Sequence, residues 1–205
     1  MPKLLLATNN EAKVREYKQL LQGLPFKLVS LAEQGIMTRV NEVGESLEEN
    51  ARIKATTLAR ESQLLTLADD SGLEVDALGG EPGPLSARYA GAGASDKDRI
   101  NYLLARLRGV PGEKRSARFR CVVAIATPDG KVELCTGECQ GFIILEPRGE
   151  EGFGYDPVFY LPELGKTMAE LPLEVKNKIS HRGQAARKAR KLLMKWHSAA
   201  TPTSL

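Results

Sequence analysis

Two acidic residues in succession, Asp69 and Asp70, follow the apolar run at 64–68. Neighbouring side chains on a strand point to opposite faces, so one carboxylate can face a ligand while the other supports the structure. A carboxylate at the end of a buried strand can hold Mg²⁺ or take a proton from water. Because Asp-Ser-Gly also favours turns, an ordinary turn at 69–72 explains the same residues equally well.

A second polar segment, Thr8 to Lys13, joins an apolar run at 3–7 to a stretch with helical spacing. The start of a helix exposes backbone N–H groups that attract anions, and Lys13 adds a charge suited to phosphate. This is not a P-loop, because the chain's Gly-Lys-Thr, at 165–167, has Tyr160 where the first glycine belongs. From this segment alone, a helix cap with a solvated lysine is the favoured explanation.

Acidic residues also gather at 42–49. Glu48 and Glu49 stand at a predicted helix start, where they complement the helix dipole. Glu42 precedes that cap and has no such explanation. It can join a carboxylate of the 69–70 pair in binding Mg²⁺, which often takes one or two carboxylates together with substrate phosphates. A solvated acidic loop is the simpler interpretation of Glu42 alone.

The segment Gly152 to Pro157 combines glycines, aromatic rings and an acid. Glycine lets a backbone approach a ligand closely, and Phe153 or Tyr155 can stack on a base. Asp156 can accept hydrogen bonds from a base or a sugar. Pro157 stands where a dinucleotide fingerprint needs its third glycine, so that motif is excluded. A hairpin corner is the structural alternative.

A basic group follows near the C-terminus. Arg182 can fork onto a phosphate or a base carbonyl, with His181 beside it and Lys176 a few residues upstream. A capped helix start with solvated charges explains the same residues. The chain has two histidines, which is poor material for a zinc site or a Ser-His-Asp triad.

The elements that must position these residues alternate between strands and helices. Strands are predicted at 3–7, 26–30, 64–68, 73–78, 118–126 and 132–144, and helices at 14–21, 46–61, 98–108 and 183–196. The order predicts a mixed α/β fold. Ligands in open α/β sheets bind at the carboxyl ends of strands, where Thr8 and Asp70 stand.

Composition excludes several classes of protein. The chain has 205 residues, of which 42% are hydrophobic, so it can bury a sizeable core in one domain. A net charge of +3 is too mild for coating a polynucleotide. Three cysteines, an odd number, favour a reducing compartment over a disulfide framework. The apolar N-terminal run is too short for a signal peptide or a membrane span. We therefore expect a cytoplasmic protein with one domain over residues 1–197 and a flexible tail at 198–205.

Phosphate donors, carboxylates, a glycine-aromatic loop and a basic helix start together describe a binder of a nucleoside phosphate and a divalent ion. The combination resembles the inosine triphosphate pyrophosphatase family. The matching segments are Thr8 to Lys13, Glu49 to Ala55, Asp69 to Leu73, Ser86 to Tyr89, Phe153 to Pro157 and Ser180 to Gly183. The resemblance extends from about Lys3 to Trp196.

The resemblance implies an elongated α/β protein with a mixed central sheet flanked by helices, two lobes and a substrate cleft between them. It implies a homodimer that uses Mg²⁺ to hydrolyse ITP, dITP and XTP to the nucleoside monophosphate and pyrophosphate. Triphosphate binding falls to Thr8, Asn9, Asn10 and Lys13. Asp70 is the implied catalytic residue, Glu42 and Asp70 the implied metal ligands, and Ser71 a substrate contact. The implied base pocket consists of Phe153, Gly154, Tyr155, Asp156, Lys176, His181 and Arg182.

Two other interpretations remain open. A Maf-like pyrophosphatase catalyses a related reaction but prefers pyrimidine or modified nucleotides. A module without catalytic activity that binds nucleotides or RNA would use the basic helix at 187–191. The family resemblance itself implies neither a nucleic-acid nor a membrane partner.

Overall fold

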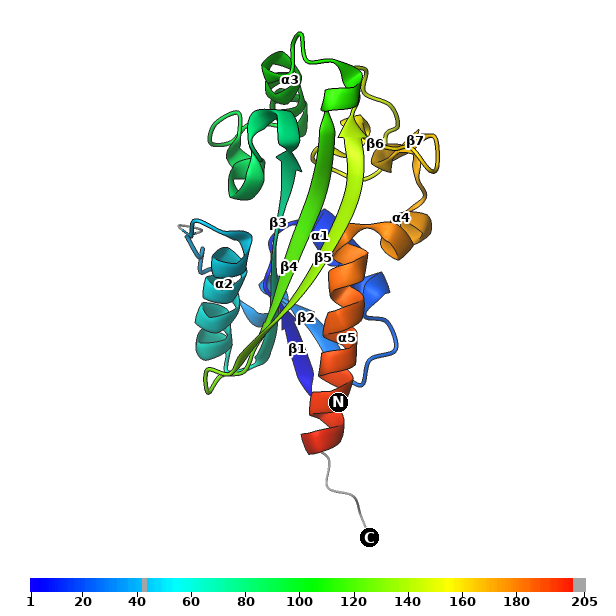
Figure 1. Ribbon diagram of the computed structural model, residues 1–205. Helices are drawn as coiled ribbons and strands as arrows, with labels where there is room; N and C mark the ends of the chain where they lie inside the picture. The colour runs from blue at the N-terminus through cyan, green and yellow to red at the C-terminus, as the bar shows by residue number, and fades with distance from the viewer. Residues whose placement is uncertain (42–43, 201–205) are drawn as a thin grey trace. The chain divides into compact units, whose positions relative to one another are not determined.

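The computed structural model describes residues 1–41 and 44–200 (Figure 1). Its strands are β1 (Lys3–Leu6), β2 (Lys27–Ser30), β3 (Leu65–Val75), β4 (Ser116–Ala126), β5 (Val132–Ile143), β6 (Phe159–Leu161) and β7 (Lys166–Thr167). Its α-helices are α1 (Glu11–Leu20), α2 (Leu47–Ser62), α3 (Asp96–Arg106), α4 (Leu173–Ile179) and α5 (His181–Ala200). Within the described residues the strands form one sheet in the order β2-β1-β3-β4-β5-β6-β7.

The sheet is mixed. β1 pairs in parallel with β2 and with β3, whereas β5, β6 and β7 pair antiparallel. Parallel strands need a crossover connection, and α1 and α2 supply the helices of these crossovers. The predicted fold class, a mixed α/β sheet flanked by helices, is confirmed.

The chain divides into two compact units. The first gathers the described residues among 1–70, 122–137 and 183–205, and the second comprises 71–121 and 138–182. Three strands, β3, β4 and β5, contribute residues to both units. A single domain over 1–197 stays a prediction. α5 continues to Ala200, and the rest of the predicted tail, 201–205, lies outside the described residues.

The core of the first unit has helices on both faces of its strands. Leu5 of β1 packs in one cluster with Ala51, Ala55 and Leu58, which lie on one face of α2. Leu4 points to the opposite face by strand alternation and is fully buried there. Figure 1 shows α2 on one side of these strands and α5 on the other. This packing fixes the carboxyl end of β1, which leads into the polar segment at 8–13.

The core of the second unit includes apolar residues of α3 and Leu107, which directly follows that helix. Ile100, Leu103 and Leu107 are buried in one cluster, and Leu104 is partly buried against it. The same cluster contains residues of β3, β4 and β5 and the ring of Phe159. This packing holds α3 against the strands, and with it Asp96, the first residue of the helix.

The prediction of two strands separated by a turn at 69–72 was wrong. β3 is one strand of eleven residues that passes straight through Asp69-Asp70-Ser71-Gly72. Its first three residues pair with β1, whose last paired residue is Leu6. β3 thus continues beyond the end of β1. Asp69 and Asp70 therefore lie past the residues of β3 that pair with β1. The helix α4 was also missed, because seven residues are too few to show a clear helical period.

The cysteines Cys135 and Cys139 lie on one face of β5 and are buried. Burial raises the pKa of the Cys139 thiol from 9.0 to about 11 and also raises the pKa of the Cys135 thiol. Because the thiolate is the nucleophile, both groups stay in the unreactive thiol form at neutral pH.

We therefore expect Ellman's reagent, near pH 8, to label these two thiols at least about tenfold more slowly in the folded protein than in denaturant. Cys139→Ala and Cys135→Ala variants assign the slow reactions to their residues. Fast labelling of either thiol in the folded protein would contradict the burial seen here.

Among the residues described, no helix combines the length and the apolar character needed to cross a membrane.

Candidate active site

The segment between β1 and α1 is braced by its own side chains. The Asn10 side chain caps α1 by accepting the N–H of Lys13 at 3.1 Å, and the Thr8 hydroxyl accepts the N–H of Asn10 at 3.2 Å. Asn9 and Asn10 are exposed and Thr8 is half-buried. Each bracing side chain uses its oxygen as the acceptor, so its donor hydrogens can serve an anion at the start of α1. The four predicted triphosphate residues therefore lie in one ordered segment.

Lys13 pairs with Asp69 rather than standing in solvent. Its ammonium lies 3.0 Å from Oδ1 and 2.9 Å from Oδ2 of a carboxylate whose side chain is 1% exposed. Asp69 thus holds the Lys13 ammonium beside the part of β3 that extends beyond the end of β1. This is the supporting role that strand alternation predicted for one acid of the pair.

Asp70 is held by two residues of α2. Asn50, fully buried, donates from Nδ2 to Asp70 Oδ2 at 3.0 Å, and the Lys54 ammonium lies 3.6 Å from Oδ1. Lys54 also donates to the backbone oxygen of Asp69 at 2.6 Å. The carboxylate therefore has a fixed orientation and a cation beside it.

Sequence reasoning assigned no role to Asn50 or Lys54. Both lie within the segment 49–55, which carries part of the family resemblance, four residues apart and therefore on one side of α2. The available signal was the position of Asn50 beside the alanines of the apolar face of α2, because an amide at such a position needs a partner.

The donor chemistry around Asp70 fits a hard divalent cation. Mg²⁺ binds oxygen ligands and often needs only one or two carboxylates when substrate phosphates complete its shell. Asp70 supplies two carboxylate oxygens and is 6% exposed. Glu42, the second predicted ligand, lies outside the described residues. Within the described part of the chain, no three acidic, histidine or cysteine side chains gather into a metal site built from protein ligands alone.

The glycine-aromatic loop is ordered by a buried ion pair in the second unit. Lys176 on α4 donates to Asp156 Oδ2 at 2.5 Å, and their side chains are 2% and 4% exposed. The same oxygen accepts the N–H of Phe153 at 2.9 Å. A Cβ atom at Gly152 would fall 2.1 Å from that oxygen, so only glycine fits over the pair. The pair thus sets the course of the loop.

Cations approach the ring of Phe153. The Lys176 ammonium lies 4.9 Å and the Arg182 guanidinium carbon 5.3 Å from its centroid. Arg182, 2% exposed, also donates to the Ser71 hydroxyl at 3.0 Å. His181 stacks on the Phe119 ring with centroids 4.7 Å apart. Ser71, Phe153, Lys176 and Arg182 are therefore linked by direct contacts.

Tyr155 has an internal partner. Its hydroxyl donates to the backbone oxygen of Ser86 at 2.8 Å, and the residue is 4% exposed. Burial raises the pKa of this hydroxyl above its usual range, so it remains a neutral donor. Its neighbour Gly154 has a left-handed backbone, with φ of +62°, and is half-buried. The hydrogen bond from Tyr155 to Ser86 thus helps to hold the loop in place.

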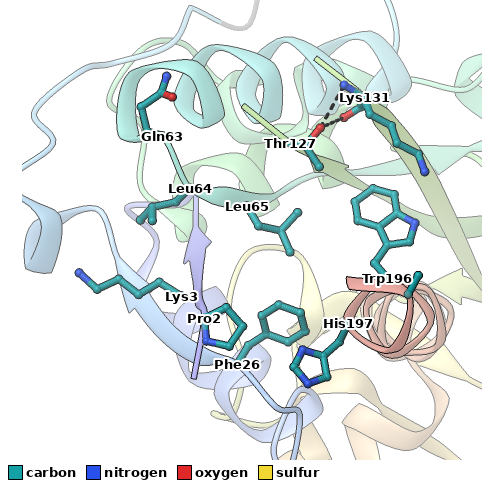
Figure 2. Close-up of a pocket in the computed structure, with 11 residues that line it drawn as sticks. Pro2, Lys3, Phe26, Gln63, Leu64, Leu65, Thr127, Lys131, Trp196 and His197 are labelled. Atoms are coloured by element: carbon teal, nitrogen blue, oxygen red, sulfur yellow. Dashed lines mark hydrogen bonds between the residues drawn. The ribbon is translucent and has the colours of Figure 1, made fainter. Parts of the chain in front are cut away.

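A pocket of about 630 Å³ lies elsewhere in the first unit (Figure 2). Its walls include Phe26, Leu65 and the chain's single tryptophan, Trp196. Lys3 and Leu65, at the amino ends of β1 and β3, place it at the opposite end of these parallel strands from Thr8 and Asp70. The pocket is thus separate from the predicted phosphate-binding residues.

The fold and these two groups of residues define an α/β protein equipped for nucleotide chemistry: a carboxylate held beside lysines in one unit, and an aromatic loop with buried cations in the other. The chain belongs to the Ham1 family, whose model matches residues 4–192. The family resemblance inferred from the motifs is confirmed.

Known relatives cover nearly the whole chain. A protein of Desulforamulus reducens named dITP/XTP pyrophosphatase is 51% identical over 93% of this chain and 95% of its own. One of the same name from Bacillus subtilis is 46% identical over 94% of this chain and 98% of its own. A HAM1 protein of Coxiella burnetii has a solved structure with a TM-score of 0.87 at 41% identity, covering 95% of this chain and 100% of that one.

Proposed function

We propose that this protein hydrolyses noncanonical purine nucleoside triphosphates, namely ITP, dITP and XTP, to the nucleoside monophosphate and pyrophosphate. The observation that carries the proposal is the Asp70 carboxylate, fixed by Asn50 and flanked by Lys54. It occurs in a chain whose relatives, 46% and 51% identical, are named dITP/XTP pyrophosphatase.

The first unit carries the groups for the phosphates. Thr8, Asn9 and Asn10 would donate to phosphate oxygens, and the ammonium groups of Lys13 and Lys54 would offset charge that develops on the reacting phosphorus. Asp70 would orient a water or accept its proton, since Asn50 already holds the carboxylate in place. We propose Asp70 and Glu42 as ligands of a Mg²⁺ ion, which when bound supplies Lewis-acid polarisation of the phosphate.

The second unit carries the groups for the base. Phe153 would stack on the purine, and buried donors of Lys176, His181 and Arg182 would pair with a 6-keto oxygen. Adenine presents an amino group there, which would leave such donors unpaired. A site built this way can reject the wrong partner by roughly 10⁴-fold. Guanine keeps the 6-keto edge, so its 2-amino group must provide the discrimination.

Three finer proposals rest on the family resemblance: that the natural metal is Mg²⁺, that the protein is a homodimer, and that it works in the cytoplasm. Three reduced, buried cysteines support a reducing location. Light scattering of the purified protein measures the oligomeric state.

The test is pyrophosphate release from a panel of nucleotides in the presence of Mg²⁺. We expect kcat/KM for ITP, dITP and XTP to exceed that for ATP and GTP by at least about a hundredfold, and chelation of the metal to abolish release. Equal turnover of all purine nucleotides would contradict the proposed function. Preference for pyrimidine nucleotides would indicate Maf-like specificity, and binding without release would indicate a module without catalytic activity.

A further inference from the structure

The loop at 152–156 has little regular structure of its own to fix its course. Gly152 and Gly154 both have left-handed backbones, with φ of +78° and +62°. Two consecutive N–H groups in this loop are each held by a carboxylate: Phe153 N–H by Asp156, and Gly154 N–H by Asp96. The first carboxylate belongs to the loop. The second comes from α3, outside every residue assigned above to substrate or metal.

The Asp96 carboxylate has two tasks, one for each oxygen. Oδ2 accepts the Gly154 N–H at 2.6 Å, and Oδ1 pairs with the Arg99 guanidinium one turn along α3. Arg99 in turn donates to the backbone oxygens of Ala87, at 2.9 Å, and Ala94, at 2.6 Å. The contact with Arg99 therefore fixes the orientation of the Asp96 carboxylate independently of the loop. The short distance from Asp96 Oδ2 to the Gly154 nitrogen is typical of a hydrogen bond to a charged acceptor.

The segment 83–99, which includes Asp96, also contacts the loop at Tyr155 and contacts β3 at Leu73. Tyr155 donates to the Ser86 backbone oxygen, and the Ser86 hydroxyl accepts the Leu73 N–H at 2.9 Å. A Cβ atom on Gly72 would fall 2.4 Å from the Gly83 oxygen, so the segment lies directly against β3 beside Ser71. Residues 83–99 thus connect the strand that carries Ser71 to the loop that carries Phe153.

We propose that Asp96 is a positioning residue for base recognition, acting through the Gly154 N–H to fix the Phe153 ring. The inference rests on the proposed function, because it takes residues 153–156 as part of the base pocket. Phe153 precedes Gly154 directly, so a loop released at Gly154 can rotate the ring away from Lys176 and Arg182. The Asp96 carboxylate bonds to Gly154 and Arg99, neither of which is assigned to the phosphates, so catalysis of a bound nucleotide should change little.

The decisive experiment compares Asp96→Ala with a matched control on the same turn of helix. Asp98 completes the capping box with Ser95, accepting the Ser95 N–H at 2.9 Å and the Ser95 hydroxyl at 2.6 Å, whereas the Gly154 N–H is held by Asp96. Asp98→Ala therefore weakens the start of α3 but leaves the Gly154 bond in place. Any general effect of a weakened helix start appears in both variants, as a similar fall in Tm.

We expect Asp96→Ala to raise KM for ITP by about tenfold with kcat within about threefold, and to lower the preference for ITP over GTP at least about fivefold. Asp98→Ala should retain wild-type KM and preference. Asp96→Asn keeps one acceptor oxygen for two donors and should give an intermediate KM. If Asp96→Ala matches Asp98→Ala in KM and in base preference, or if kcat falls while KM holds, the positioning role is wrong.

The outcome for the wild-type protein separates this inference from the proposed function. A wild-type protein without activity on ITP, dITP or XTP refutes the proposed function and the inference together. A wild-type protein with the expected preference, combined with an Asp96→Ala variant indistinguishable from it, refutes the inference alone. Folding of each variant is checked by circular dichroism and Tm before kinetics.

Discussion

An Asp70→Asn variant is expected to fold normally and to lose pyrophosphate release by at least about a hundredfold in kcat. The amide has the shape of the carboxylate and retains an oxygen that can accept the Asn50 hydrogen bond. Lys54 keeps its second contact, the Asp69 backbone oxygen at 2.6 Å. What the variant loses is the negative charge that would bind a cation or take a proton from water.

The measurement is kcat for ITP, together with the thermal melting curve of each protein. Asp129→Asn serves as the control, because Asp129 is an exposed acid in the turn between β4 and β5, bonded to Thr127. It should retain wild-type activity. An Asp70→Asn protein within tenfold of wild type would refute the catalytic role, whereas a protein that fails to melt cooperatively would show instead that the charge supports the fold.

Strands and helices with regular apolar spacing were predictable from the sequence. α2 begins at Leu47 with Ser46 as its cap, close to the predicted start of the helix at 46, and the hairpin between β4 and β5 turns at 128–130. β3 was not predictable as one strand, because Asp-Ser-Gly has strong local turn preference. Tertiary context overrides that preference: Leu73 N–H is held by the Ser86 hydroxyl thirteen residues away.

The candidate site was likewise predictable from the sequence only in part. Charged residues such as Lys13, Asp70 and Arg182 could be selected from the sequence as candidate site residues. Their partners could not: Lys13 and Asp69 lie 56 residues apart, and Arg182 and Ser71 lie 111 apart. Sequence spacing within a helix or strand constrains local neighbours only, so pairs brought together by the sheet stay hidden until the fold is known.

Tyr155 illustrates a second limit. Tyr155 was predicted to lie in the base pocket, and this stays a prediction; nothing in the local sequence shows that its hydroxyl donates to the Ser86 backbone oxygen. The residue type permits stacking, hydrogen bonding to a ligand and internal bracing alike. The structure shows the internal hydrogen bond of the hydroxyl, which the residue type alone could not reveal.

The buried pair of Asp156 and Lys176 should have a large effect on stability when one partner is removed. Asp156→Ala leaves the Lys176 ammonium, 2% exposed, without the carboxylate that balances its charge. We expect the free energy of unfolding to fall by about 3–5 kcal/mol, the usual cost of an uncompensated buried charge. Lys176→Met should lower it by a similar amount. Urea unfolding of each variant measures the change, and a loss below about 1 kcal/mol for both would contradict it.

Removing both charges together distinguishes stability from recognition. A buried ion pair often contributes little net stability, because desolvation of the two charges offsets their attraction. The double variant Asp156→Leu, Lys176→Met should therefore regain most of the stability that either single change loses. It should not regain activity on ITP, since Phe153 N–H loses its acceptor and the loop loses a cation near the ring. Recovered stability without recovered activity would mean that the pair is retained for the substrate. Recovery of both would assign the base-recognition role to other residues of the loop.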